Sequence, residues 1–387
     1  MGERVGIEVS IAAAEAAALC DVDVVAAYPI TPQTHVVEHL SELVADGHLD
    51  AEFVPVESEH SAMSVCCGSA AVGARTFTAT AAQGLALMAE IVFIASSMRL
   101  PMVMFLANRA MSAPLSIWND HSDTMMVRDC GWIQVFCEDG QEVFDSIIHG
   151  FRVSEDPRVS LPYMLNVDGF TLTHVIEPIE FWTKEMVQQY LPPFKPLHRL
   201  HPDKVVSMGA FGMPEVYAEQ RYAHEHAILQ SRPIIDQAWD ELAKITGRKY
   251  SSVEQYKTED AETLILAMGT MCGTASLAVD KLRKEGRKVG LVKLRLWRPL
   301  PVFELRQALS KAKNVLVIDR AVTPGAGTAP VVSEVRSIMY HEAQRPNIYS
   351  VLAGIGGRDV TPDDVISMLN MALAGDVDDY HFYGVRG

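Results

Sequence analysis

Short apolar runs alternate with longer stretches of small and amphipathic residues between Val5 and Gly169. Runs of about four to eight residues rich in β-branched and aromatic side chains are typical of strands, and the longer stretches have the length of helices. Strands are predicted at Val22–Ala27, Glu52–Val56, Arg75–Thr80, Met102–Ala107, Ile133–Phe136 and Tyr163–Val167. Helices are predicted at Thr34–Ala45, Ser61–Gly73, Ala86–Ser97 and Gln141–Val153. This alternation predicts repeated β-α units around a parallel sheet, that is, a doubly wound domain.

The pattern changes after Ile176, where prolines interrupt any long helix: Pro178, Pro192, Pro193, Pro196, Pro202 and Pro214. The stretch from Glu215 to Thr246 then has the spacing of one long helix, and the polar stretch Gly247–Asp260 follows it. Further strands are predicted at Thr263–Met268, Lys288–Arg295, Val315–Ile318 and Ile348–Leu352, and helices at Thr274–Arg283, Val302–Ser310, Ala329–Tyr340 and Pro362–Leu373. We therefore predict two doubly wound α/β domains with parallel sheets. The first, residues 1–250, includes the proline-rich extension and the long helix, and the second is residues 251–387.

The length and the net charge of the chain limit which kinds of protein it can be. The 387 residues suit two or three domains of about 100–200 residues each. The formal net charge of −16 would repel nucleic-acid phosphates and anionic lipids, so neither kind of partner is expected. No apolar run approaches the roughly 18 residues of a membrane helix, and the N-terminus lacks the pattern of a signal peptide. We expect a cytoplasmic protein.

The cysteines are scattered without a C-x-x-C pair: Cys20, Cys66, Cys67, Cys130, Cys137 and Cys272. Iron–sulfur or zinc ligation by this chain alone is therefore not expected, and we predict no metal site in it. Several free thiols favour a reducing compartment. His60, His121 and the other histidines are interpreted as polar surface or loop residues rather than metal ligands.

Candidate chemistry lies directly after predicted strands, where parallel sheets place their ligand crevices. The turn Tyr28–Pro32 sets Thr31 between two prolines, which holds a small hydroxyl stiffly at the sheet edge. The alternative is a rigid strand-to-helix turn in which Thr31 caps the helix. In the next such stretch, Val56–His60, a glutamate either points into a crevice or only complements the dipole of the helix that it begins.

A polar, basic and aromatic cluster follows the fourth predicted strand and comprises Asn108–Pro114 and Trp118–Asp123. Loops of this kind bind ligands more often than they merely connect elements. Arg109 has the fork geometry to hold a carboxylate through two hydrogen bonds. The alternative is an ion pair of Arg109 with Asp120 or Asp123.

Together these stretches resemble the alpha subunit, or the equivalent domains, of pyruvate:ferredoxin oxidoreductases. The resemblance spans nearly the whole chain and is carried by Tyr28–Pro32, Ser58–Glu59, Gln83–Leu85, Asn108–Ala110, Ser112–Pro114, Trp118–Asp123, Gly131–Gln134, Asp168–Phe170, Met208–Tyr222, Lys293–Arg295 and Gly356–Thr361. It implies that the first domain binds the pyrimidine half of thiamine diphosphate and that the second is of the transketolase C-terminal type.

The resemblance also assigns roles to single residues. It implies that Glu59 hydrogen-bonds the pyrimidine ring of the cofactor and acts as a proton relay. Thr31 and Arg109 match positions that contact the keto and carboxylate ends of the substrate. The remaining implied contacts are Tyr28, Pro29 and Gln83 to the cofactor, and Asn108 and Phe105 to the substrate.

The implied enzyme is incomplete without partners. The chain has no Gly-Asp-Gly followed by paired asparagines to hold Mg²⁺ and the diphosphate. The resemblance implies that a beta-type subunit brings that site and a [4Fe-4S] cluster, and that gamma- and delta-type subunits bring coenzyme A contacts and a ferredoxin-like module. The implied reaction is the CoA-dependent oxidative decarboxylation of a 2-oxoacid, most simply pyruvate, to acyl-CoA and CO2. Electrons would pass through the clusters to ferredoxin, as in anaerobic metabolism.

Phe105 leaves the identity of the 2-oxoacid undecided. Family members that use pyruvate commonly have a small polar residue at this position. If Phe105 lines the pocket, a bulkier or aromatic 2-oxoacid such as phenylglyoxylate is favoured, with NAD as the final acceptor. If it faces the core, pyruvate is the simplest substrate. Two other hypotheses are a non-oxidative thiamine diphosphate enzyme and a scaffold without catalysis. The turn Tyr28–Pro32 and the loop Asn108–Asp123 argue against the first. The cost of an unliganded Glu and Arg in a crevice argues against the second.

Overall fold

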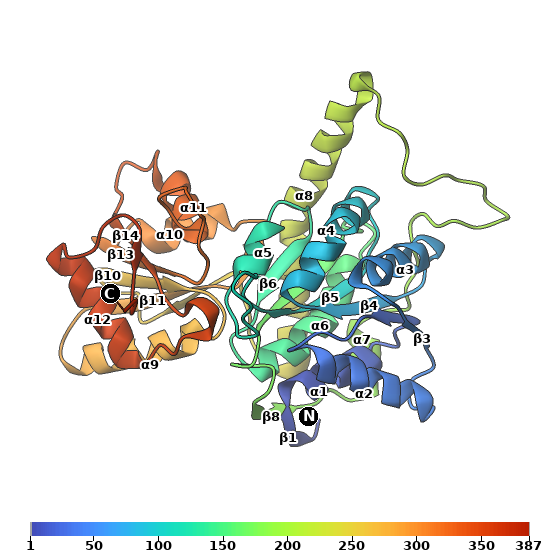
Figure 1. Ribbon diagram of the computed structural model, residues 1–387, viewed down its shortest axis with the longest axis horizontal. Coiled ribbons are helices and arrows are strands. Elements are labelled where there is room, and N and C mark those ends of the chain that lie inside the picture. Colours follow the sequence, from blue (N-terminus) through green and yellow to red (C-terminus); the bar gives the residue numbers. More distant parts are fainter. Residues whose placement is uncertain (1, 387) are drawn as a thin grey trace.

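The computed structural model describes residues 2–386 and contains two large β-sheets, each covered by helices on both faces (Figure 1). The first sheet has seven strands in the order β12-β6-β7-β5-β4-β2-β3. Its strands are β2 (Val24–Ala27), β3 (Glu52–Pro55), β4 (Thr76–Thr80), β5 (Val103–Asn108), β6 (Ile133–Phe136), β7 (Tyr163–Asp168) and β12 (Leu296–Arg298). All neighbours pair in parallel except β12, which runs antiparallel to β6.

Helices cover both faces of this sheet because its central strands are apolar on both sides. In β5, Phe105 packs into the core on one face, while Met104 and Leu106 pack into the core on the other. The first face is covered by α1 (Val9–Leu19), α2 (Thr34–Ala45) and α6 (Gly140–Ser154), and the second by α3 (Glu59–Val72) and α4 (Ala82–Ser97). This arrangement confirms the doubly wound fold predicted for the first domain.

The second sheet has six strands in the order β15-β14-β13-β10-β11-β9, with only β9 antiparallel to its neighbour. Its strands are β9 (Val253–Tyr256), β10 (Thr263–Ala267), β11 (Val289–Leu294), β13 (Asn314–Asp319), β14 (Asn347–Leu352) and β15 (His381–Phe382). Its helices are α9 (Met271–Lys284), α10 (Val302–Leu309), α11 (Pro330–Met339) and α12 (Pro362–Ala374), and a short 3-10 turn spans Ile355–Gly357. The boundary predicted after residue 250 lies just before β9, although β12 returns to the first sheet.

The remaining elements connect or extend the two sheets. A two-stranded ribbon pairs β1 (Arg4–Glu8) with β8 (Ile176–Glu180), and α5 (Ser122–Met126) and α7 (Lys184–Tyr190) are short. The long helix α8 (Pro214–Thr246) packs its second half on α6, while its first turns, residues 214–223, are exposed and project from the molecule in Figure 1. Within the described residues, no helix is both long and apolar enough to cross a membrane.

Candidate active site

The predicted site residues lie at one edge of the first sheet. Because β2, β3, β4 and β5 run in parallel, the segments that follow them emerge at the same edge. Thr31 follows β2, Glu59 begins α3 after β3, Gln83 lies in the first turn of α4 after β4, and Arg109 follows β5.

Glu59 is a buried carboxylate without a protein partner. Its side chain is 6% exposed, and none of the described residues hydrogen-bonds or ion-pairs with it. Ser58 caps α3 by accepting the N–H of Ser61 at 3.3 Å, which sets Glu59 as the first helical residue. The helix dipole therefore also favours this carboxylate, as the simpler alternative supposed. The dipole does not explain the burial, because burying an ionised group without a partner is costly.

The backbone of Gly84 forms one wall around this carboxylate. A Cβ atom on Gly84 would overlap Thr80 Oγ1 and lie 2.7 Å from Glu59 Oε1. Thr80 Oγ1 and Gln83 Oε1 nearby are also buried without hydrogen-bond partners. Three polar groups around one glycine are thus left unsatisfied by the protein, which is the pattern expected where a polar ligand completes the hydrogen bonding.

Arg109 forms no ion pair with an acidic side chain among the described residues. Its Nη1 donates to the carbonyl oxygen of Thr31 at 2.9 Å, and its Nε donates to that of Ser116 at 3.1 Å. The ion pair with Asp120 or Asp123 that we considered is absent, so that alternative is wrong. Burial of the guanidinium lowers the pKa of Arg109, and the nearby charge of Asp123 opposes that shift.

The Thr31 turn differs from the helix-cap alternative. Gln33, not Thr31, is the N-cap residue of α2, and Thr31 is exposed at the sheet edge. The Gln33 amide instead donates to the carbonyl of Tyr28 at 2.8 Å, which closes the turn. Tyr28 and Pro29 are exposed on the same turn.

Asn108 and Phe105 do not face the crevice. The Asn108 amide is fully buried and donates to Asp123 at 3.0 Å and to Thr124 at 2.8 Å. Asp123 in turn accepts the N–H of Arg109 at 2.9 Å, so Asn108 holds the Arg109 loop in place through Asp123. Burial raises the pKa of Asp123 to about 7, although these donors oppose the shift. Phe105 is completely buried in the hydrophobic core.

A buried polar cluster joins the two domains behind this loop. Asp168, at the end of β7, accepts from Arg320 at 2.8 Å and from the N–H of Thr270 at 2.9 Å, and lies 2.8 Å from His121 Nε2. His121 is 2% exposed and lies in the loop before α5, so of the two settings that we expected, surface or loop, it has the second. Thr270 lies in the glycine-bearing turn Gly269–Thr274 and Arg320 directly follows a predicted strand, but their pairing with Asp168 could not be predicted, because both lie more than a hundred residues from it along the chain.

Replacing Asp168 with Asn is expected to destabilise the chain by about 3–5 kcal/mol, because it leaves Arg320 buried without its counter-charge. Burial alone would raise the pKa of Asp168, but Arg320 and His121 hold it well below its usual range. This stabilisation is therefore present above the unfolded-state pKa of about 3.9 and is lost as the pH falls below it. Urea unfolding at pH 7 and in acid tests both parts. Asp363→Asn, which removes the exposed pair with Lys281, is the control and should cost less than about 1 kcal/mol.

The cysteines do not form a ligand set within the described chain. All six are free, and only Cys67 is not fully buried. Burial raises the pKa of Cys66, Cys67 and Cys130 to about 12, so these thiols stay protonated. This agrees with the packed-thiol interpretation of the sequence.

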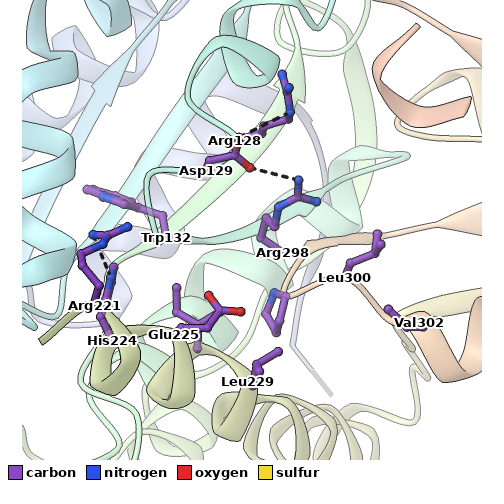
Figure 2. Close-up of a pocket in the computed structure, with 13 residues that line it drawn as sticks. Arg128, Asp129, Trp132, Arg221, His224, Glu225, Leu229, Arg298, Leu300 and Val302 are labelled. Carbon is purple, nitrogen blue, oxygen red and sulfur yellow. Dashed lines mark hydrogen bonds and ion pairs between the residues drawn. The ribbon is translucent and has the colours of Figure 1, made fainter. Parts of the chain in front are cut away.

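A cavity of about 390 Å³ lies away from this site, between α8, the loop before β6 and the segment after β12 (Figure 2). Trp132, Arg221, His224 and Arg298 line it, whereas Thr31, Glu59 and Arg109 do not. Large apolar side chains are exposed on α4 and on the Arg109 loop. These are Leu87, Phe93 and Ile94 on α4, and Leu115 and Trp118 in the Arg109 loop.

Comparisons with known proteins identify a family. Residues 15–239 match the family model described as the thiamine diphosphate-binding domain of pyruvate flavodoxin/ferredoxin oxidoreductases, and residues 261–365 match core domain II of pyruvate:ferredoxin oxidoreductases. The chain is 46% identical to pyruvate synthase subunit PorA of Methanocaldococcus jannaschii, over 97% of this chain and 96% of that one. It is 42% identical to ketoisovalerate oxidoreductase subunit VorA of Pyrococcus horikoshii, over 92% and 90%.

Two solved structures share the fold at low sequence identity. The 2-oxoglutarate:ferredoxin oxidoreductase of Magnetococcus marinus aligns with a TM-score of 0.71 at 20% identity, over 95% of this chain and 65% of that one. A split-gene transketolase aligns with a TM-score of 0.55 at 13% identity, over 96% and 99%. Both alignments support the two-domain α/β architecture.

Proposed function

The chain belongs to the pyruvate:ferredoxin oxidoreductase family as an alpha-type subunit of a 2-oxoacid oxidoreductase, and on this premise we propose that it binds the 2-oxoacid and the pyrimidine half of thiamine diphosphate. The proposed reaction is the CoA-dependent oxidative decarboxylation of pyruvate to acetyl-CoA and CO2. The observation that carries the proposal is the buried carboxylate of Glu59, which has no hydrogen-bond partner among the described residues and lies at the same sheet edge as the guanidinium of Arg109.

The residues around Glu59 fit the pyrimidine of the cofactor. A flat heterocycle with ring nitrogens and an amino group offers hydrogen-bond partners to Thr80 Oγ1 and Gln83 Oε1, which have none among the described residues, and to the buried carboxylate of Glu59. Gly84 keeps the wall beside the carboxylate free of a side chain. When bound, thiamine diphosphate supplies the electron sink for decarboxylation. Glu59 would accept a hydrogen bond from the ring and hold a proton there.

Arg109 and Thr31 would position the substrate. The two carbonyl contacts of Arg109 fix its guanidinium, and its Nη2 donates to none of the described residues. This guanidinium nitrogen is therefore available to hold a carboxylate in a charge-assisted hydrogen bond. The Thr31 hydroxyl, on the same turn as the carbonyl that Arg109 contacts, is free to donate to the keto oxygen.

The rest of the site would come from partner subunits. We propose a beta-type subunit that carries the Mg²⁺ and diphosphate site with a [4Fe-4S] cluster, and gamma- and delta-type subunits that lead electrons to ferredoxin. The exposed apolar side chains of α4 and of the Arg109 loop support a covering partner, because such patches mark interaction surfaces. A subunit seated there would exclude water from the crevice.

We propose pyruvate as the substrate. The bulkier-acid alternative depended on Phe105 lining the pocket, and Phe105 lies in the core instead. That alternative, with NAD as its final acceptor, therefore has no support from this side chain.

The test is anaerobic turnover of the native complex, purified through a tag on this chain. Pyruvate, 2-oxoisovalerate, 2-oxoglutarate and phenylglyoxylate are compared with coenzyme A and an artificial one-electron acceptor. We expect CoA-dependent acceptor reduction with the highest kcat/KM for pyruvate. A preference for phenylglyoxylate would overturn the substrate assignment. No reduction with any acid, from a complex with intact clusters and cofactor, would favour the non-oxidative alternative.

A further inference from the structure

Two histidines and a glutamate from three separate elements converge beside the Thr31 turn. Glu8 ends β1, His35 lies in the first turn of α2, and His174 precedes β8. The antiparallel pairing of β1 with β8 sets Glu8 opposite Ile176, and main-chain hydrogen bonds from Val9 and Ser10 lock the adjoining segment in place. The backbone thus fixes Glu8 next to His174, and the start of α2 brings His35 to them.

The three side chains have the spacing of a ligand set. Their nitrogen and oxygen ligand atoms all lie within 4.8 Å of one another, and this is the one such group among residues 2–386. His35 Nδ1 lies 2.6 Å from Glu8 Oε1, and the ring centroids of His35 and His174 are 4.7 Å apart. Ligands about 2.1 Å from a tetrahedral metal ion stand about 3.4 Å apart, so small side-chain rotations would complete the site.

A further contact orients His174. Thr173 Oγ1 accepts the main-chain N–H of Phe170 at 2.9 Å and lies 2.7 Å from His174 Nδ1. If Nδ1 donates its proton to this oxygen, Nε2 keeps the lone pair that a metal ion needs. Metal-binding histidines commonly make such a second hydrogen bond, which fixes the tautomer and the ring direction.

The neighbouring histidine pair gives a useful contrast. His39, one turn further along α2, pairs with Glu15 at 2.7 Å. That contact is also a histidine with a glutamate, but it has no second imidazole. Substitutions at the two places can therefore distinguish an ordinary ion pair, His39 with Glu15, from a metal site that uses His35.

We propose that Glu8, His35 and His174 bind one divalent transition-metal ion, with Zn²⁺ or Co²⁺ as suitable occupants. Two imidazoles and one carboxylate suit such ions and leave coordination positions for water. The side chain of His35 is 43% exposed, so the ion can enter from solvent. The bound ion would join β1, α2 and the segment before β8, at the base of the turn that carries Thr31. This site is independent of the proposed reaction.

Metal titration of the full-length chain tests the proposal. After chelator treatment, Co²⁺ is followed by its visible absorption and Zn²⁺ by calorimetry. We expect about one equivalent to bind with micromolar or tighter affinity and to raise the thermal unfolding midpoint. His35→Ala, at the most exposed ligand, should weaken binding at least tenfold, and so should His174→Gln. His39→Ala should bind like the wild type.

Three results would overturn the proposal. The first is the absence of saturable binding of about one equivalent. The second is binding that persists in His35→Ala and His174→Gln chains whose circular dichroism matches the wild type. The third is a cobalt–thiolate charge-transfer band, which would place the ion on the half-buried Cys67 rather than on the histidines.

Discussion

Replacing Glu59 with Gln is expected to lower kcat of the assembled complex by about 10²- to 10⁴-fold, the range for loss of a positioned acid–base group. Glutamine keeps the shape beside Gly84, so the carboxylate charge is the property removed. Glu57→Gln is the matched control, because Glu57 is exposed and hydrogen-bonds only Ser61. Steady-state kinetics of the complex measure the effect, and Glu57→Gln should stay within about twofold of the wild type.

The same substitution should leave the isolated chain at least as stable as the wild type. A buried carboxylate without a partner costs free energy, and glutamine removes that cost. Lower activity with undiminished stability would identify Glu59 as a functional group. Wild-type turnover in an assembled Glu59→Gln complex would instead favour the scaffold hypothesis.

Replacing Arg109 with Ala is expected to lower kcat/KM for the 2-oxoacid by about 10²- to 10³-fold, with much of the loss in KM. The guanidinium would bind the substrate carboxylate, and a charge-assisted hydrogen bond of this kind is worth about 1.5–3 kcal/mol, with misorientation adding to the loss. Arg109→Lys should recover little, because an ammonium cannot both contact the Thr31 and Ser116 carbonyls and fork onto a carboxylate.

Two measurements separate this role from a structural one. Affinity for thiamine diphosphate should be unchanged in Arg109→Ala and weakened in Glu59→Gln, because only Glu59 would contact the cofactor. Arg128→Ala, at a partly exposed arginine that lines the cavity of Figure 2, should leave kcat/KM unchanged. An Arg109→Ala complex with a wild-type KM would contradict the substrate-clamp assignment.

The sequence predicted the regular parallel parts of the fold because their signals are local. The run Ile133–Phe136 and the helix Thr34–Ala45 were predicted to the residue. Helix α4 begins at Ala82, four residues before the predicted start, because Ala81 provides no side-chain cap to mark it. The short antiparallel strands β9 and β12 were not predicted. They pair with strands distant in sequence. Half of β9 is polar, and β12 directly follows the predicted strand Lys288–Arg295 without a turn signal between them.

Candidate site residues could be located because strand ends in a parallel sheet meet at one edge. Their contacts could not be predicted, because these depend on packing. A strand buried on both faces gives no pattern that says which face Phe105 takes. The partners of Arg109 turned out to be carbonyl groups, which every residue has and which leave no trace in a sequence. The pairing of Asp168 with Arg320 depends in the same way on how the two domains meet.

Thiamine diphosphate binding to this chain, to its partner subunits and to the assembled complex is the measurement that most directly tests whether this subunit supplies half of the cofactor site. We expect tight, Mg²⁺-dependent binding only by the assembled complex, weakened by Glu59→Gln and required for 2-oxoacid turnover. Tight binding by the partner subunits alone, unaffected by Glu59→Gln after assembly, would contradict it.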